Sequence, residues 1–87
     1  MVDEDKLRLL VLDTLRQIAP EADLQTLDPE RSFRDQFGID SIDYLNLIMA
    51  LEQKLKLRIA DYDYPKLSSL RGCLDYLTSR TAAADIL

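Results

Sequence analysis

Residues 41–55 most strongly constrain the fold, because they carry two separate apolar stripes at the spacing of an α-helix. At about 100° per residue, the first stripe falls within roughly 100° of the helix surface and contains Tyr44, Leu47, Ile48, Leu51 and Leu55. The second stripe, about 145° away, contains Ile42, Leu45 and Met49. One set of neighbours cannot easily bury both stripes. We therefore expect the first to face the core, and the second to be either covered by another element or free to dock a partner.

The rest of the chain also reads as helical. Apolar residues recur at helical spacing over residues 7–18, after the acidic residues Asp3, Glu4 and Asp5, and this helix should end near Ala19. Residues 20–40 read as a long connection with sparse apolar residues and room for a turn of helix.

A brief element is expected over residues 61–64, either a short helix or, because Pro65 follows, only a turn. Ser68 or Ser69 should cap a last helix that runs to about Thr78. No strand alternation is present. The pattern predicts an all-α bundle of three main helices plus a short third helix or turn, with a long loop between helices one and two.

Composition excludes several functions. The chain has 87 residues, enough for one small domain, and its 47% hydrophobic content is too high for a disordered chain. Its formal charge of -5 argues against nucleic acid, and no apolar run is long enough for membrane insertion. There is no histidine and only one cysteine, Cys73, so a catalytic base, a disulfide or a cysteine-cluster metal site is not expected. Without a recognisable leader, the prediction is a cytoplasmic monomer.

Ser41 stands at the start of the predicted helix 41–55, directly after Asp40 and two residues before Asp43. Taken alone, this pattern is more often a helix cap than a modified site. An exposed hydroxyl at a helix N-terminus is nevertheless a suitable place for a phosphodiester, because the first-turn N–H groups and the helix dipole favour an anion. A serine hydrolase is not expected, because the chain offers no histidine base and no glycine elbow around the serine.

The segment Phe-Gly-Ile-Asp-Ser-Ile-Asp at residues 37–43 resembles the phosphopantetheine attachment site of acyl carrier proteins. The resemblance extends from Leu7 to about Arg80 and includes the order of helices. It implies a four-helix acyl carrier domain over residues 1–80, with residues 81–87 as a flexible tail. It also implies that Ser41, preceded by the motif residue Asp40, carries 4'-phosphopantetheine, whose thiol holds acyl groups as thioesters. The chain would then be a carrier and not an enzyme.

The resemblance also implies a partner surface. Ile42, Leu45 and Met49 match the family's partner-facing hydrophobic positions, and Asp43 and Glu52, with Asp40, match part of its acidic recognition surface. The cargo is expected to enter a cavity between helices two, three and four. The acidic surface is diluted here by neutral and basic residues, namely Asn46, Gln53, Lys54, Lys56 and Arg58.

The expected partners are a phosphopantetheinyl transferase and either an acyl ligase or synthase or the enzymes of fatty acid, specialised lipid or polyketide synthesis. Two alternatives stay open: an aminoacyl carrier of the D-alanyl type, and an unmodified helical adaptor that binds an amphipathic peptide through Ile42, Leu45 and Met49. The sequence names neither the cargo nor the pathway.

Overall fold

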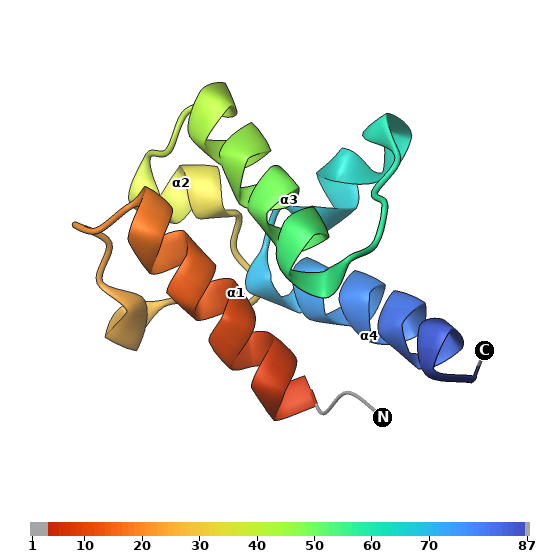
Figure 1. Ribbon diagram of the computed structural model, residues 1–87. Helices are drawn as coiled ribbons and strands as arrows, with labels where there is room; N and C mark the ends of the chain where they lie inside the picture. Colours follow the sequence, from red (N-terminus) through yellow and green to blue (C-terminus); the bar gives the residue numbers. More distant parts are fainter. Residues whose placement is uncertain (1–3, 87) are drawn as a thin grey trace.

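The computed structural model describes the backbone of residues 4–86 and the side chains of residues 4–80. Its elements are four α-helices and two 3₁₀ helices: α1 (Glu4–Ile18), η1 (Leu24–Thr26), α2 (Phe33–Phe37), α3 (Ser41–Leu55), η2 (Asp61–Leu67) and α4 (Leu70–Ile86) (Figure 1). The described part of the chain contains no strand, and the prediction of an all-α four-helix bundle is confirmed.

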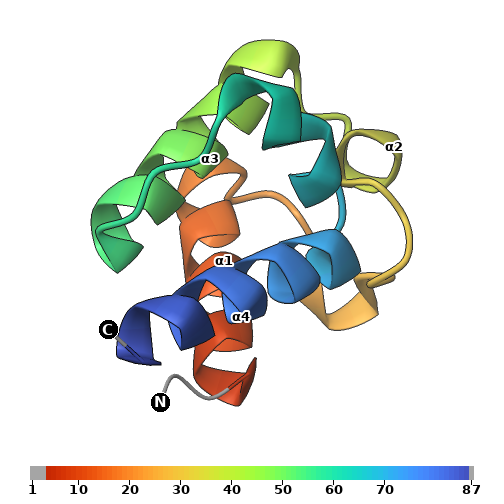
Figure 2. The same cartoon turned by 90° about the vertical axis from the view of Figure 1, so that its right-hand side faces the viewer.

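Three long helices form the frame of the bundle. Helix α1 packs against both α3 and α4, while η2 lies against α4 (Figure 2). The start of α1 and the end of α4 lie near each other at one end of the molecule in both views. The start of α3 lies at the opposite end, so the predicted attachment site is remote from the start of α1 and the end of α4.

Helix α1 forms as its apolar spacing predicts. Leu7, Val11 and Leu15 are buried on one face, and Glu4 and Asp5 lie in the first turn, where the helix dipole favours negative charge. The helix ends at Ile18, one residue before the predicted end. Asp3, also expected to favour this N-terminus, lies outside the described residues.

The long connection between α1 and α3 is folded into two short helices. Asp23 caps η1 by accepting a hydrogen bond from the Gln25 N–H, and Ser32 caps α2 by accepting one from the Asp35 N–H. Gly38 ends α2 in the left-handed conformation, with φ of 68°, and its N–H donates to the Arg34 carbonyl. The sequence allows for one turn of helix in this connection, whereas the structure contains two short helices. Together, η1 and α2 bring the chain to the start of α3.

The element after α3 is longer than predicted. Of the two possibilities for residues 61–64, a short helix or only a turn, the structure shows a helix, and η2 continues through Pro65 to Leu67. The φ angle that proline fixes is close to that of a 3₁₀ helix, so proline removes one N–H donor without a change of backbone direction. Leu67 thereby reaches the core, where it is fully buried.

The last helix also exceeds its prediction. Ser69 accepts a hydrogen bond from the Gly72 N–H and so caps α4 as expected, but the helix continues past Thr78 to Ile86. Residues 81–87 were predicted to form a flexible tail. Residues 81–86 are helical in backbone, their side chains are not described, and the flexibility of this segment stays a prediction. Gly72 lies so close to η2 that a Cβ at this position would collide with the Lys66 carbonyl.

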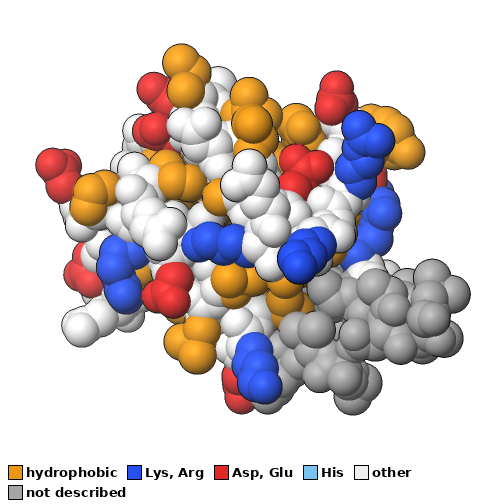
Figure 3. Space-filling view, viewed as in Figure 1, with side chains coloured by type: hydrophobic (Ala, Val, Ile, Leu, Met, Phe, Trp, Pro, Cys, Tyr) orange, Lys and Arg blue, Asp and Glu red, His pale blue; other side chains and the backbone are white. Residues whose placement is uncertain are grey.

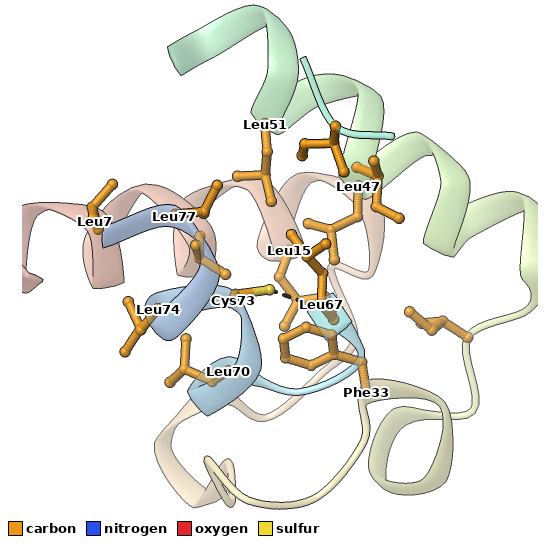
Figure 4. Packing of buried hydrophobic residues seen from close by; sticks show 14 residues of the cluster. Leu7, Leu15, Phe33, Leu47, Leu51, Leu67, Leu70, Cys73, Leu74 and Leu77 are labelled. Carbon is orange, nitrogen blue, oxygen red and sulfur yellow. Dashed lines mark hydrogen bonds between the residues drawn. The ribbon is translucent and has the colours of Figure 1, made fainter. Parts of the chain in front are cut away.

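The core lies where α1, α3, η2 and α4 meet. Figure 4 shows Phe33 and Leu67 against Leu15 and Cys73, with Leu47 and Leu51 closing the core from α3. Phe33 is held there by its backbone, since its N–H donates to the Ser68 carbonyl over 2.8 Å. Among the described residues, no helix is both long enough and apolar enough to cross a bilayer.

Candidate functional site: the start of helix α3

Ser41 is the first residue of α3, and its side chain is exposed. Asp40 is the N-cap, because its carboxylate accepts a hydrogen bond of 2.8 Å from the Asp43 N–H. The Tyr44 N–H donates to the Asp40 carbonyl, which completes the first turn. Within the described part of the chain, the Ser41 hydroxyl makes no hydrogen bond. The capping role that a serine in this place usually has is thus filled by Asp40, and the hydroxyl is free for chemistry.

The first turn of α3 suits a covalently attached phosphate. The N–H groups of Ser41 and Ile42 precede the first intrahelical hydrogen bond and face outward, as at any helix start. The dipole of a 15-residue helix adds partial positive charge at this end. A phosphodiester on the Ser41 oxygen would sit where both effects favour an anion. The residues present therefore fit the prosthetic group that the sequence pattern implies.

Within the described residues, no element covers the outward stripe of α3. Ile42 is 70% exposed, Met49 48% and Leu45 41%, whereas Leu47, Ile48 and Leu51 on the inward stripe are fully buried. Hydrophobic side chains reach the surface over the upper part of the molecule in Figure 3, where α3 runs. Of the two possibilities that the sequence left for the second stripe, the structure shows the uncovered one.

The acidic residues predicted for partner recognition have different surroundings. Asp40 is exposed but engaged as the helix cap, and Asp43, in the first turn of α3, is half-buried. Glu52 lies further along α3, where its carboxylate accepts a 2.9 Å hydrogen bond from the Ile59 N–H. This hydrogen bond fixes the segment after α3 to the helix. The carboxylate of Glu52 has a structural role that spacing along the helix could not reveal.

Two grooves flank the start of α3. One, of about 510 Å³, lies between the end of α1, the connection and α3, and includes Ile18, Phe37 and Asp43 in its lining. The other, of about 330 Å³, lies between α2, α3 and η2, and is lined by Ser32, Arg34, Tyr44, Tyr64, Pro65 and Ser68. Sequence analysis assigned Tyr44 to the core and gave Tyr64 no role. Helical spacing in the sequence cannot predict a groove that forms between elements distant in the chain.

A buried carboxylate joins η2 to α4. Asp63 is 3% exposed, and its carboxylate accepts hydrogen bonds from the Tyr76 hydroxyl, over 2.8 Å, and from the Arg80 guanidinium, over 3.2 Å. The Lys66 ammonium lies 3.1 Å from its other oxygen. The Tyr76 and Lys66 hydrogen bonds hold the pKa of Asp63 below its ordinary value. Sequence analysis missed this cluster, whose partners are 3 to 17 residues apart.

Cys73 faces the interior from α4 and is fully buried. Burial raises the pKa of its thiol to about 12. Its sulfur lies 3.3 Å from the Leu67 carbonyl, to which the thiol donates a weak hydrogen bond. Arg71, the nearest cation in sequence, instead pairs with Glu4 at 3.3 Å and Asp75 at 3.6 Å. Cys73 therefore lacks the cation and exposure that a reactive thiol needs.

The fold and the site together define a small helical carrier domain, and comparisons with known proteins agree. The model of the family described as "Phosphopantetheine attachment site" matches residues 5–77. Acyl carrier proteins from two strains of Nitratidesulfovibrio vulgaris, DP4 and Hildenborough, are each 32% identical over 77 residues. These matches cover 88% of this chain and 95% of the relative. The chain belongs to the acyl carrier protein family.

A solved structure shows the same fold. The solution structure of a protein from Anaplasma phagocytophilum, described as a candidate acyl carrier protein, superposes with a TM-score of 0.79. It is 24% identical, and the match covers 92% of this chain and 93% of that one. At this identity the likeness supports the fold alone.

Membership of the family settles the general function. Acyl carrier proteins carry 4'-phosphopantetheine and are not enzymes. They work together with a phosphopantetheinyl transferase and with enzymes of synthesis. The predictions of the family, the cofactor and the absence of enzymatic activity are therefore confirmed.

Proposed function

We propose that Ser41 carries the 4'-phosphopantetheine arm and that this chain shuttles acyl groups between enzymes of fatty acid, specialised lipid or polyketide synthesis. The main support for this proposal is the exposed hydroxyl of Ser41, which is free because Asp40 already caps the helix that Ser41 begins. When bound, the arm supplies a terminal thiol that holds the acyl group as a thioester. The chain itself supplies the attachment oxygen, the positive end of a helix dipole and a surface for partners.

The outward stripe of α3 supports the second part of the proposal. Ile42, Leu45 and Met49 form an exposed apolar strip that begins beside Ser41, so an enzyme that binds the strip would hold the arm at its entrance. Asp40 and Asp43 add negative charge at the same end, which suits a basic rim on the partner. Glu52 completes the proposed surface through whichever part of its carboxylate the Ile59 N–H leaves accessible. We propose further that the chain acts in the cytoplasm as a monomer.

The attachment site is tested by intact mass after incubation with coenzyme A, magnesium and a phosphopantetheinyl transferase. The wild-type chain should gain the mass of one phosphopantetheinyl group, and Ser41→Ala should gain none. Because Asp40 provides the cap, Ser41→Ala should keep its helical circular dichroism and lose at most about 1 kcal/mol of stability. Ser79→Ala, also at an exposed serine, is the matched control and should be modified like the wild type.

A Ser41→Ala chain that still acquires the arm would contradict the assignment. A wild-type chain that never acquires it would favour an unmodified adaptor. The mass of the protein purified from its natural host would identify the arm and its cargo in one measurement. An aminoacyl cargo would show that the chain is an aminoacyl carrier and not an acyl carrier.

A further inference from the structure

The two ends of α3 carry opposite charge. Asp40 and Asp43 lie at its start, beside Ser41. At its end and just beyond, residues 53–58 contain no acidic residue and three bases at alternate positions: Lys54, Lys56 and Arg58. In Figure 3, acidic side chains lie near the start of α3, and basic side chains gather around its end. The two ends are about 20 Å apart, because a 15-residue helix rises about 1.5 Å per residue.

The three bases differ in what they contact. The Lys54 ammonium donates a hydrogen bond to the Thr14 hydroxyl over 2.8 Å and lies 3.5 Å from the Gln17 amide oxygen, so Lys54 joins α3 to α1. Lys56 and Arg58 are exposed, and within the described residues neither side chain has a hydrogen bond or an ion pair. The free positive charge at this end of α3 is therefore that of Lys56 and Arg58.

Lys56 continues the outward apolar stripe of α3. At about 100° per residue, position 56 falls between Leu45 and Met49 around the helix axis. The strip that begins beside the attachment site thus ends at a cation. Glu52, one turn earlier, has the spacing to pair with Lys56, but its carboxylate accepts the Ile59 N–H instead. The charge of Lys56 therefore stays available to a partner.

The backbone of Lys56 is in a conformation that disfavours lysine. Lys56 ends α3 with a φ of 54°, and it is the only residue other than glycine with a positive φ in the described part of the chain. Helices commonly end in this conformation at glycine, as α2 does at Gly38, because glycine has no Cβ. A cation here also suits the helix dipole. The dipole does not account for Arg58, which lies outside the helix.

Arg58 lies on a surface groove of about 360 Å³ between the end of α3 and η2. Tyr62, on the same groove, is 83% exposed and adds an apolar ring. The lining also includes Asp61 and Arg80, and Arg80 is paired with the buried Asp63 at 3.2 Å. Within the described residues, Arg58 thus provides the unpaired guanidinium of this groove, which suits a carboxylate from a partner.

We propose that the outward face of α3 recognises a partner enzyme whose docking surface is bipolar. That surface is basic where it meets Asp40 and Asp43, near the entrance for the arm, and acidic where it meets Lys56 and Arg58. The proposal rests on the proposed carrier function and names the chemistry of its partner. Such a surface fixes the orientation of the docked pair, and it disfavours a partner that is basic throughout, because like charges would then meet at one end.

A protein surface suits these charges better than a membrane does. Two free bases are few compared with the clusters of about four to eight that hold a chain on anionic lipid. The acidic start of α3 would also face the same negative surface and be repelled by it. A partner with both signs of charge, placed about 20 Å apart, satisfies both ends of the helix at once.

The test uses two synthetic amphipathic helical peptides of about 18 residues, long enough to span α3. Both have the same apolar face of Leu and Ala. In the all-Lys peptide every polar position is Lys, and in the bipolar peptide one half carries Lys and the other half Glu. The isotope-labelled chain, without the arm, is titrated with each peptide at about 0.15 M salt, where charges more than about 8 Å apart are largely screened. Amide chemical shifts report the binding surface and the Kd.

The bipolar peptide should bind the outward face of α3 with its acidic half at the end of the helix. A paramagnetic label on the acidic half should broaden the amide signals of residues 56–58 and spare those of residues 40–43. The double variant Lys56→Gln/Arg58→Gln should weaken the bipolar peptide about fivefold, as expected for two exposed ion pairs. The same variant should bind the all-Lys peptide more tightly, because it removes a repulsion.

Lys54→Gln is the matched control, because it removes an equal charge three residues from the end of the strip, where the ammonium is held by Thr14. It should change neither Kd by more than about twofold, whereas Lys56→Gln alone should weaken the bipolar peptide about two- to threefold. Lys56→Gly should raise the melting temperature, since glycine adopts the positive φ freely, and should still weaken the bipolar peptide. A purely structural lysine would not give these two changes together.

Loss of affinity for both peptides in a double variant shown to be folded by circular dichroism would overturn the proposal. So would broadening of residues 40–43 by the acidic half, or no binding of the bipolar peptide. Sedimentation of the chain with phosphatidylglycerol vesicles, without a response to the bipolar peptide, would replace the enzyme with a membrane. Shifts at residues 56–58 that grow with protein concentration, without peptide, would replace it with a second copy. Because the arm is absent from this test, failure of attachment counts against Ser41 alone.

Discussion

The two faces of α3 carry similar apolar side chains in opposite surroundings. The inward face, with Leu47 and Leu51 as its centre, is sealed against α1 and the rest of the core. The outward face, with Ile42 and Met49, lies uncovered beside Ser41. Exposed apolar surface contributes little to folding, and a contiguous apolar patch is typical of interaction sites. The difference teaches that one helix can supply both the stability of the domain and a proposed surface for its partners.

The most direct test of this difference between the two faces is to truncate one residue on each. Leu51→Ala should lower the free energy of unfolding by about 2–5 kcal/mol, because it removes a fully buried side chain and leaves a cavity. Chemical denaturation measures the loss, which is a large share of the stability of a small domain.

Met49→Ala is the matched variant on the other face. With 48% of Met49 exposed, its truncation should change the unfolding free energy by less than about 0.5 kcal/mol, yet slow arm attachment or acyl transfer by partner enzymes. Equal losses of stability in Leu51→Ala and Met49→Ala would show that both faces belong to the core.

The next test concerns the support of the inward side by the carboxylate of Asp63. Because the pKa of Asp63 is lowered on folding, its contribution to stability is fully present above the ordinary carboxyl pKa of about 3.9 and is lost as the pH falls through the lower folded-state value. Asp63→Asn should therefore melt below the wild type at pH 7, with the gap closing below about pH 4. Melting temperatures between pH 3 and pH 7 measure this. A gap that is constant across the range would mean that the ionised carboxylate is not what joins η2 to α4.

A further test concerns Cys73, which reports whether the inward side is closed to solvent. With the pKa of its thiol raised to about 12 by burial, Cys73 stays protonated at pH 7, and burial also blocks access to it. Cys73→Ala should cost about 1 kcal/mol and leave arm attachment unchanged. Alkylation of the folded chain should be no faster than unfolding, as followed by mass. Rapid alkylation at neutral pH would show that the interior opens readily.

The sequence predicts what local interactions determine. The buried face of α1, the cap at Asp40 and the start of α3 follow from spacing and capping within one or two turns. The pairs that the sequence did not reveal join residues far apart in the chain: Tyr44 with Tyr64, 20 residues on, and Asp63 with Arg80, 17 residues on. No periodicity encodes such contacts, because the packing of separate elements decides them.

Two helices extend further than the sequence indicates. Pro65 disfavours the interior of an α-helix, so the sequence left a turn possible at residues 61–64, whereas the 3₁₀ geometry of η2 accommodates proline. The last helix was expected to end near Thr78 but continues to Ile86. The following Ala-rich residues, 82–84, have the highest intrinsic helix propensity, which carries the helix onward without an apolar stripe. Of the site, the position and exposure of Ser41 followed from the motif, while the grooves around it did not.

The close approach of Gly72 to η2 has a mechanical consequence. The absence of a side chain at Gly72 lets the backbones of η2 and α4 touch, and Asp63 with Tyr76 and Arg80 fastens the same two elements a turn away. Between η2 and α3, by contrast, the one side-chain hydrogen bond in the described part of the chain comes from the hydroxyl of Tyr44. The contact between η2 and α4 is thus held by several interactions, and the contact between η2 and α3 by few. When the bundle breathes, η2 should travel with α4 as one rigid body, and the gap should open along α3, beside the serine.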